Sequence, residues 1–311
     1  MYSKTLMAFL LAAAAATLAA GPRPPSSKPA TATTTYLGYN PSTGTDNKSY
    51  KILYQLPNPS LSGPGPYPVF VWLPGSYELY TDPQSQIFMQ LMAAQGFLAA
   101  SVQYDNNETV QICSSYTDRA QSVFNASAST SAISVLCKIP GAACSKGIVT
   151  SGISQGGMLA VLAKNYAPQV AATYALSISD YNLNAGGVDL SACMDKQYTA
   201  IPADRLVIVN GISDEYYAGQ QPLENVSGYT CPTGTFQCWS PTGSGAGWYI
   251  VQNSQVIDGV ADHCYQMDGG CSGRSFDTNW YLPSTYNWSL IPNIDWLATF
   301  GTMRVFSPTG Q

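Results

Sequence analysis

The sequence predicts an α/β fold in which a mostly parallel central sheet is covered by helices on both faces. Short apolar runs at 68–73 and 205–209 are typical of strands that are buried on both sides of a parallel sheet. Between such runs lie segments whose apolar residues recur at helical spacing, as at 85–96. Strands that alternate with helices form parallel sheets, and these sheets bind their ligands at the carboxyl ends of the strands.

The expected elements follow one another from residue 50 onward. Residues 50–56 alternate like a strand, and a turn-rich connection leads to the strand at 68–73. The helix at 85–96 has Ile87, Phe88 and Leu91 at helical spacing. The remaining expectations are strands over 97–102, 147–150, 172–179, 205–209 and 248–252, and helices over 118–136, from 157 and over 291–300.

The first 35 residues are expected to lie outside the folded domain. Residues 1–20 have the pattern of a signal peptide, in which Lys4 precedes an apolar core at 6–16 and small residues follow. Residues 21–35 are rich in Pro, Ser and Thr and predict a linker, which leaves 36–311 as a single domain. A signal anchor is the alternative interpretation, although the apolar stretch is short for a membrane span and no later run reaches spanning length.

Composition favours an extracellular protein that does not bind nucleic acid. Charged residues make up only 10% of the chain, so uncharged polar side chains and tyrosine must form much of its surface. The net charge of −5 gives no basic surface for phosphate contacts. Asn-x-Ser/Thr sequons, which predict a glycoprotein if the source is eukaryotic, begin at Asn47, Asn107, Asn125, Asn225 and Asn287.

Eight cysteines indicate an oxidising compartment, and their even number suggests four disulfides. The connectivity is not readable from the sequence, but the closely spaced pairs Cys231–Cys238 and Cys264–Cys271 are the favoured candidates. Zinc binding is the competing use of cysteine, and no C-x-x-C pair supports it, so we expect no metal.

The segment Gly152-Ile153-Ser154-Gln155-Gly156 is a G-x-S-x-G pattern between a strand-like run and a helix-like run. A sharp turn between a strand and a helix exposes the serine hydroxyl at the positive end of a helix, where an oxyanion can be stabilised. Because Gly and Ser are abundant in this chain, an ordinary structural turn is the alternative. The strand and the helix on either side favour Ser154 as a nucleophile.

A nucleophilic serine needs a general base, and the chain has one histidine, His263. It lies near the C-terminal end after the strand-like residues 248–252, where a loop could carry it to the site. A carboxylate should orient the imidazole. Asp214 is favoured because it follows the apolar run 205–209, and Asp180, which ends the run 172–179, is its rival. Glu215 and Asp262 are further candidates for this carboxylate, and the alternative is that they are only solvated charges in loops.

The chain order Ser154, Asp214, His263, together with the G-x-S-x-G pattern, resembles the α/β-hydrolase superfamily from about residue 50 to residue 300. The resemblance implies the α/β-hydrolase fold and an oxyanion hole made of two backbone N–H groups. One would be that of Gln155, and the other that of Ser76 or Tyr77 in the loop after 68–73. An ordinary turn is the alternative for this loop. It contains no His-Gly-Gly-Gly, so hydrolase branches with that motif are not supported.

These expectations combine into a secreted serine hydrolase that cleaves carboxylic esters through an acyl-enzyme and needs no cofactor. Its partner would be a small or polymeric ester. Peptidase or amidase activity on the same three residues is a second interpretation, and a secreted binding protein without turnover is a third. A bridge between Cys264 and Cys271 would restrict the loop that carries His263. The sequence predicts neither the substrate nor the oligomeric state.

Overall fold

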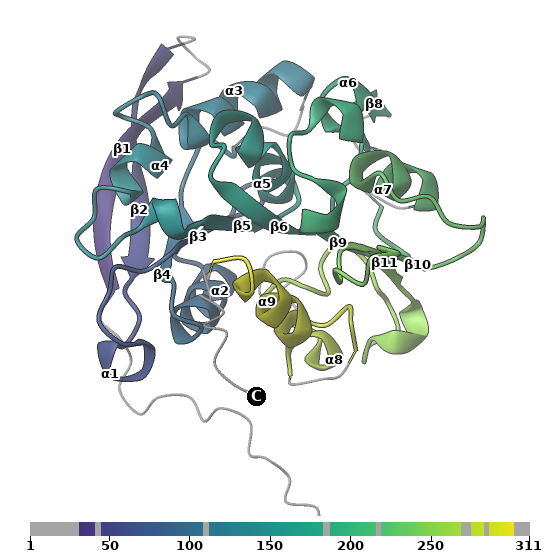
Figure 1. The fold of residues 1–311 in the computed structure, drawn as a ribbon. Helices are drawn as coiled ribbons and strands as arrows, with labels where there is room; N and C mark the ends of the chain where they lie inside the picture. Colours follow the sequence, from purple (N-terminus) through teal and green to yellow (C-terminus); the bar gives the residue numbers. More distant parts are fainter. Residues whose placement is uncertain are drawn as a thin grey trace, which may run out of the picture.

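The computed structural model describes residues 31–40, 45–107, 112–182, 187–215, 219–268, 275–282 and 286–301 of the 311-residue chain. In this part of the chain a nine-stranded sheet runs through the centre of the molecule in the order β1-β2-β4-β3-β5-β6-β9-β11-β10 (Figure 1). Its strands are β1 Thr31–Asn40, β2 Thr45–Gln55, β3 Val69–Leu73, β4 Leu98–Val102, β5 Ile148–Ile153, β6 Val170–Leu176, β9 Leu206–Gly211, β10 Gln237–Trp239 and β11 Gly247–Val251. A separate small sheet pairs β7 Tyr181–Asn182 with β8 Val188–Asp189.

Helices cover both faces of the large sheet. Figure 1 shows α3 to α7 on one face and α2, α8 and α9 on the other. The helices are α1 Pro59–Ser62, α2 Pro83–Ala94, α3 Cys113–Phe124, α4 Ala132–Leu136, α5 Gln155–Tyr166, α6 Ser191–Met194, α7 Gln220–Ser227, α8 Thr278–Tyr281 and α9 Leu290–Ala298. The predicted α/β class with a mostly parallel sheet is confirmed.

Six neighbouring strands, β4, β3, β5, β6, β9 and β11, run parallel to one another. Antiparallel strands flank them, because β2 pairs antiparallel with β4 and β10 pairs antiparallel with β11. The carboxyl ends of the six parallel strands therefore meet at one edge of the sheet. The loops that leave this edge carry the residues singled out from the sequence.

Strand β3 shows why the central strands read as unbroken apolar runs. Val69, Val71 and Leu73 belong to the core on one face of the sheet, whereas Phe70 and Trp72 belong to the core on the other. Successive side chains of a strand point to opposite faces, so a strand covered by helices on both sides needs apolar residues at every position.

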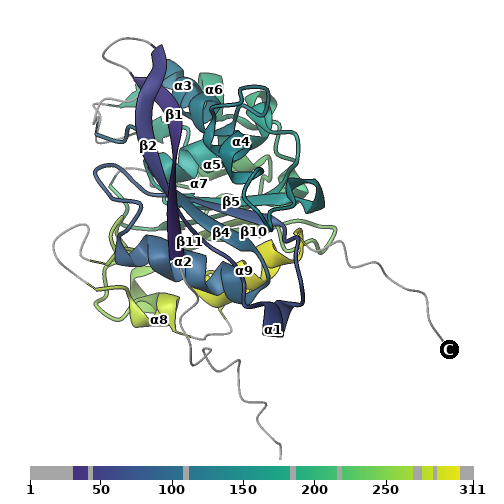
Figure 2. The same ribbon diagram turned by 90° about the vertical axis from the view of Figure 1, so that its left-hand side faces the viewer.

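The sheet begins earlier than the sequence predicted. Strand β1 starts at Thr31, so residues 31–35 belong to the sheet and not to the expected linker. These residues are threonine-rich, and threonine is common both in linkers and in strands. Pairing with β2 decides the outcome, since Tyr36 lies opposite Tyr50 with the ring centroids 5.7 Å apart and both side chains are buried. Figure 2 shows the two long strands side by side.

The expected helical segment 118–136 is two helices. α3 begins earlier, at Cys113, and ends at Phe124 because Asn125 adopts an extended conformation. α4 begins after Ser131, whose side chain accepts a hydrogen bond from the Ser134 N–H and so caps the new helix.

The disulfides tie surface segments to the core. The predicted pair Cys231–Cys238 is confirmed, with an S–S distance of 2.00 Å. It lies in the segment 220–247, which forms α7 and the edge strand β10. Two further bridges join Cys113 of α3 to Cys193 of α6 and Cys137 to Cys144. Cys271 lies outside the described residues, so its pairing with Cys264 stays a prediction.

The described residues contain neither a membrane-spanning helix nor a cluster of metal-binding side chains. None of the helices combines the length and the apolar character needed to cross a bilayer. Nor do three or more His, Cys, Asp or Glu residues of this part of the chain gather as they would around a metal ion.

Candidate active site

Ser154 occupies the turn between β5 and α5 with a backbone conformation that is rare for a residue with a side chain. Its φ is 54° and its ψ is −125°. Such a conformation is unfavourable by about 1–3 kcal/mol and persists only where the surroundings fix it. The Ser154 N–H donates to Leu176 O at 2.9 Å, and Ser154 O accepts from the Met158 N–H at 3.1 Å, so both peptide groups are held.

Glycines make this turn possible because neighbouring backbone approaches it closely. A Cβ atom on Gly156 would overlap the carbonyl oxygens of Leu73 and Pro74, and one on Gly152 would overlap the Gly156 backbone. The chain that follows β3 therefore crosses directly over the start of α5. Both glycines of the G-x-S-x-G pattern are required by packing.

Asp214 and His263 are in direct contact at the same edge of the sheet. Nδ1 of His263 lies 3.0 Å from Oδ1 and 2.9 Å from Oδ2 of Asp214. Because a carboxylate only accepts hydrogen bonds, Nδ1 carries the proton and Nε2 is left as the basic nitrogen. Asp214 is fully buried and His263 is 5% exposed, so little water competes with this contact.

The strand order explains why these two residues meet. Asp214 follows β9, His263 follows β11, and β9 and β11 are neighbours in the sheet. The two loops also bond to each other, since the Ser213 N–H donates to Ala261 O at 2.9 Å. The rival carboxylate, Asp180, follows β6 and accepts a hydrogen bond from Asn225 Nδ2 at 2.6 Å.

Burial and charge act in opposite directions on His263. Burial is the largest single effect and lowers the pKa of His263, but the carboxylates of Asp214, Glu215 and Glu78 together outweigh it, so the pKa is raised above 6.5. The hydrogen bonds among the described residues join His263 to Asp214 but not directly to Ser154. In unliganded enzymes such contacts are often long and tighten only when substrate binds.

The other two sequence candidates, Ser76 and Gln155, lie on either side of the same junction. Gln155 is the first residue of α5, where N–H groups have no acceptor within the helix. Ser76 lies in the loop after β3, whose carbonyls contact Gly156. The Tyr77 N–H, which was the alternative to Ser76, donates to Asn106 O at 3.0 Å and is therefore bound to the loop after β4.

Glu78 is a residue of this site that the sequence did not reveal. Its Oε2 accepts a hydrogen bond from the Gly75 N–H at 2.5 Å. Burial raises its pKa to about 7, against the opposing effects of the Gly75 hydrogen bond and of His263. A carboxylate in the segment Pro74–Glu78 was visible in the sequence, but only the turn of this loop shows that it folds back toward His263.

Gln266 holds the loop that carries His263. It is fully buried, its backbone O accepts from Gln84 Nε2 at 2.7 Å, and its Oε1 accepts from Ser177 Oγ at 3.2 Å. Ser177, at the end of β6, also has a positive φ, of 51°. These bonds attach the His263 loop to α2 and to the sheet.

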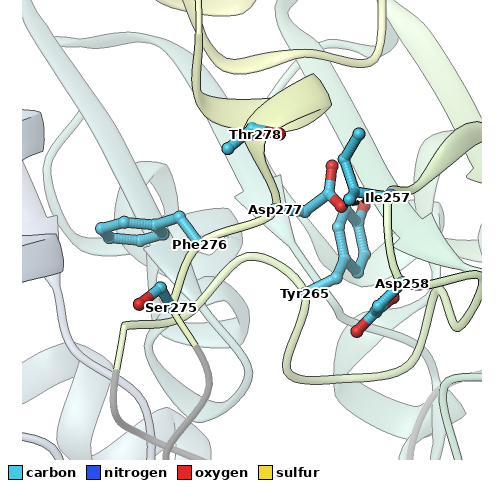
Figure 3. A pocket seen from close by; sticks show the side chains of 7 residues that line it. All are labelled: Ile257, Asp258, Tyr265, Ser275, Phe276, Asp277 and Thr278. Atoms are coloured by element: carbon cyan, nitrogen blue, oxygen red, sulfur yellow. Dashed lines mark hydrogen bonds between the residues drawn. The ribbon is translucent and has the colours of Figure 1, made fainter.

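A cavity of about 270 Å³ lies next to this loop, and Figure 3 shows the rings of Phe276 and Tyr265 on opposite sides of it. Asp277 in its wall accepts hydrogen bonds from the N–H groups of Asn279 and Trp280 and, at 2.6 Å, from the Ile257 N–H. The Asp277 N–H in turn donates to Tyr265 O at 2.9 Å. The polar groups of the wall thus support the segment that follows His263.

Comparison with known proteins gives the fold. No protein-family model matches the chain, and no curated protein matches its sequence. Among solved structures, the acylaminoacyl peptidase of Pyrococcus horikoshii matches 78% of this chain and 39% of its own, at 14% identity and a TM-score of 0.50. XC6422 of Xanthomonas campestris, described as an α/β serine hydrolase without a lid, matches 63% of this chain and 80% of its own, at 15% identity and a TM-score of 0.41. Brefeldin A esterase, described as a bacterial homologue of human hormone-sensitive lipase, matches 47% of this chain and 39% of its own, at 18% identity and a TM-score of 0.36. The chain thus spans well under half of the peptidase and of the brefeldin A esterase.

Proposed function

Because the chain has the α/β-hydrolase fold and carries a serine, a histidine and a carboxylate at one edge of its sheet, we propose that it is a secreted serine hydrolase that cleaves carboxylic esters. The observation that carries the proposal is the buried hydrogen bond between Asp214 and His263. It leaves Nε2 of the only histidine in the chain as a base, on the edge that also holds Ser154 in its strained turn.

In the proposed reaction Ser154 Oγ attacks the acyl carbon of the ester while Nε2 of His263 takes the hydroxyl proton. The Asp214 carboxylate keeps the proton on Nδ1 and stabilises the imidazolium that forms. His263 then returns the proton to the leaving alcohol, and the acyl group stays on Ser154. A water molecule, deprotonated by the same nitrogen, releases the acid and regenerates the serine.

The negative charge of the tetrahedral intermediate would be stabilised by the backbone N–H groups of Gln155 and Ser76. Gln155 opens α5, so the helix dipole adds to its donor strength. Each such donor typically contributes about 10²–10³ to kcat in serine hydrolases. No cofactor takes part in this sequence of steps.

Secretion is supported by the covalent structure. The structure has the bridges Cys113–Cys193, Cys137–Cys144 and Cys231–Cys238, and disulfides form and persist mainly in oxidising compartments. The small share of charged residues agrees with this location.

The test is turnover of a graded set of p-nitrophenyl esters and the matching p-nitroanilides by wild-type protein and by Ser154→Ala. Ester hydrolysis that is lost in Ser154→Ala supports the proposal. Faster cleavage of anilides, relative to their uncatalysed rates, would assign the same residues to a peptidase or amidase. No turnover of either set by folded, disulfide-bonded protein would favour a binding protein.

A further inference from the structure

Asn106, in the loop after β4, is hydrogen-bonded on several sides to the loop after β3 that carries Ser76. The residue is 1% exposed. Its Nδ2 donates to Gly75 O at 2.6 Å and to Glu78 O at 2.8 Å. Its backbone O accepts from the Tyr77 N–H at 3.0 Å. One buried amide thus contacts both ends of the turn that contains Ser76.

The orientation of this amide follows from its partners. Two backbone carbonyl oxygens face one end of the side chain, and carbonyls only accept, so that end is the NH₂ group. At the other end Gln103 Nε2 donates to Asn106 Oδ1 at 3.0 Å. The amide is therefore fixed at both ends and cannot rotate without losing hydrogen bonds in a buried place.

Holding Gly75 O also sets the direction of the next N–H. The Gly75–Ser76 peptide is planar, and in a trans peptide the C=O and the N–H point in opposite directions. Asn106 Nδ2 and the Glu78 N–H, the latter at 3.3 Å, both bind Gly75 O and so fix the plane of this peptide. The preceding peptide is held separately, because the Gly75 N–H donates to Glu78 Oε2.

We propose that Asn106 is a positioning residue of the oxyanion hole, which aligns the Ser76 N–H by holding the carbonyl of the same peptide. The inference rests on the proposed function, because it assigns a task to Asn106 only if Ser76 donates to an oxyanion. Asn106 itself touches neither the substrate nor the reacting atoms. Packing of the loop against Gly156 sets where the loop lies, and Asn106 sets how the peptide is turned.

The test replaces Asn106 by leucine, which is similar in size and adds no charge. Removing an oxyanion donor typically lowers kcat by about 10²–10³. A misaligned donor keeps only part of its contribution to kcat. Asn106→Leu should therefore lower kcat at least about tenfold, with KM little changed. Affinity for a trifluoromethyl ketone, whose hemiketal oxyanion occupies the hole, should fall by a similar factor.

The matched control is Asn293→Leu in α9. Asn293 is also buried, and its Nδ2 also donates to two backbone carbonyls, those of Asn287 and Ser289, at 2.8 and 2.7 Å. The two variants remove the same kind of interaction, so a merely structural role predicts similar losses of melting temperature and equal kinetics. Loss of kcat and ketone affinity in Asn106→Leu alone supports the inference, and equal kinetics in the two variants overturns it.

A second variant keeps the test decisive if Asn106→Leu does not fold. Gln103→Met changes a partly exposed residue and removes the donor to Asn106 Oδ1. A severalfold loss of kcat with a parallel loss of ketone affinity supports the inference, and unchanged values contradict it. Wild-type protein that hydrolyses no ester would instead refute the proposed function, so the two failures are distinguishable.

Discussion

Asp214 faces His263 with both of its carboxylate oxygens, at 3.0 and 2.9 Å from Nδ1. Neither residue adjoins the other in sequence, and only the adjacency of β9 and β11 brings them together. A fully buried carboxylate beside an imidazole gives one defined tautomer and a strengthened base.

Replacing Asp214 by asparagine should lower kcat by about four orders of magnitude, because an amide can stabilise the wrong tautomer of His263. The measurement is kcat on a p-nitrophenyl ester. The matched control is Asp180→Asn, which changes another buried aspartate that follows a parallel strand and bonds to Asn225 instead. Equal losses in the two variants would show that Asp214 has no special role.

Replacing Glu78 by glutamine should move the acidic limb of the kcat/KM profile to lower pH. The negative charge of Glu78 raises the pKa of His263, along with Asp214 and Glu215, and catalysis needs neutral His263. Without that charge His263 loses its proton at a lower pH. The amide oxygen of glutamine can still accept the Gly75 N–H, so the loop should be retained. An acidic limb at the same pH in both proteins would contradict an effect of the Glu78 charge on the pKa of His263.

The same variant should alter how stability depends on pH. Burial raises the pKa of Glu78 from 4.5 to about 7 in the folded protein, so the fold favours the protonated form. The stability contributed by this group is present below pH 4.5 and is lost as the pH rises through 7. Between pH 5 and pH 8 the melting temperature of wild type should therefore fall more than that of Glu78→Gln. Parallel curves would show that Glu78 titrates normally.

Gly156→Ala should destabilise the protein by about 1–3 kcal/mol or prevent folding, since its methyl group would overlap the carbonyl oxygens of Leu73 and Pro74. Denaturant unfolding measures the effect. Gly234→Ala is the control at a position where the structure has open space, although its φ of 86° adds some backbone strain. A Gly156→Ala variant as stable as wild type would exclude the close crossing of the loop over α5.

The sequence predicted the parts of the site that depend on local structure. The turn at Ser154 was recognisable because its glycines, strand and helix are contiguous. The choice between Asp214 and Asp180 could not be made from the chain alone, because both follow buried strands. Strand order explains which of the two aspartates contacts His263, since β11, which precedes His263, pairs with β9 and not with β6.

The missed features all depend on segments that meet only in the fold. The strand at 31–35 looked like linker because its pairing with β2, a later segment of the chain, decides its state. Asn106 and Glu78 gave no signal, since a single Asn or Glu in a loop is common. Their contacts with Gly75 arise where the loops after β3 and β4 pack together at the sheet edge.

Labelling with a fluorophosphonate, followed by peptide mass spectrometry, shows whether Ser154 is an activated nucleophile. Ser177 is an internal control, because it too is a buried serine with positive φ at the end of a parallel strand, but it donates to Gln266. We expect an adduct on Ser154, none on Ser177, and loss of labelling in His263→Ala. Folded protein that acquires no adduct on Ser154 would contradict this expectation.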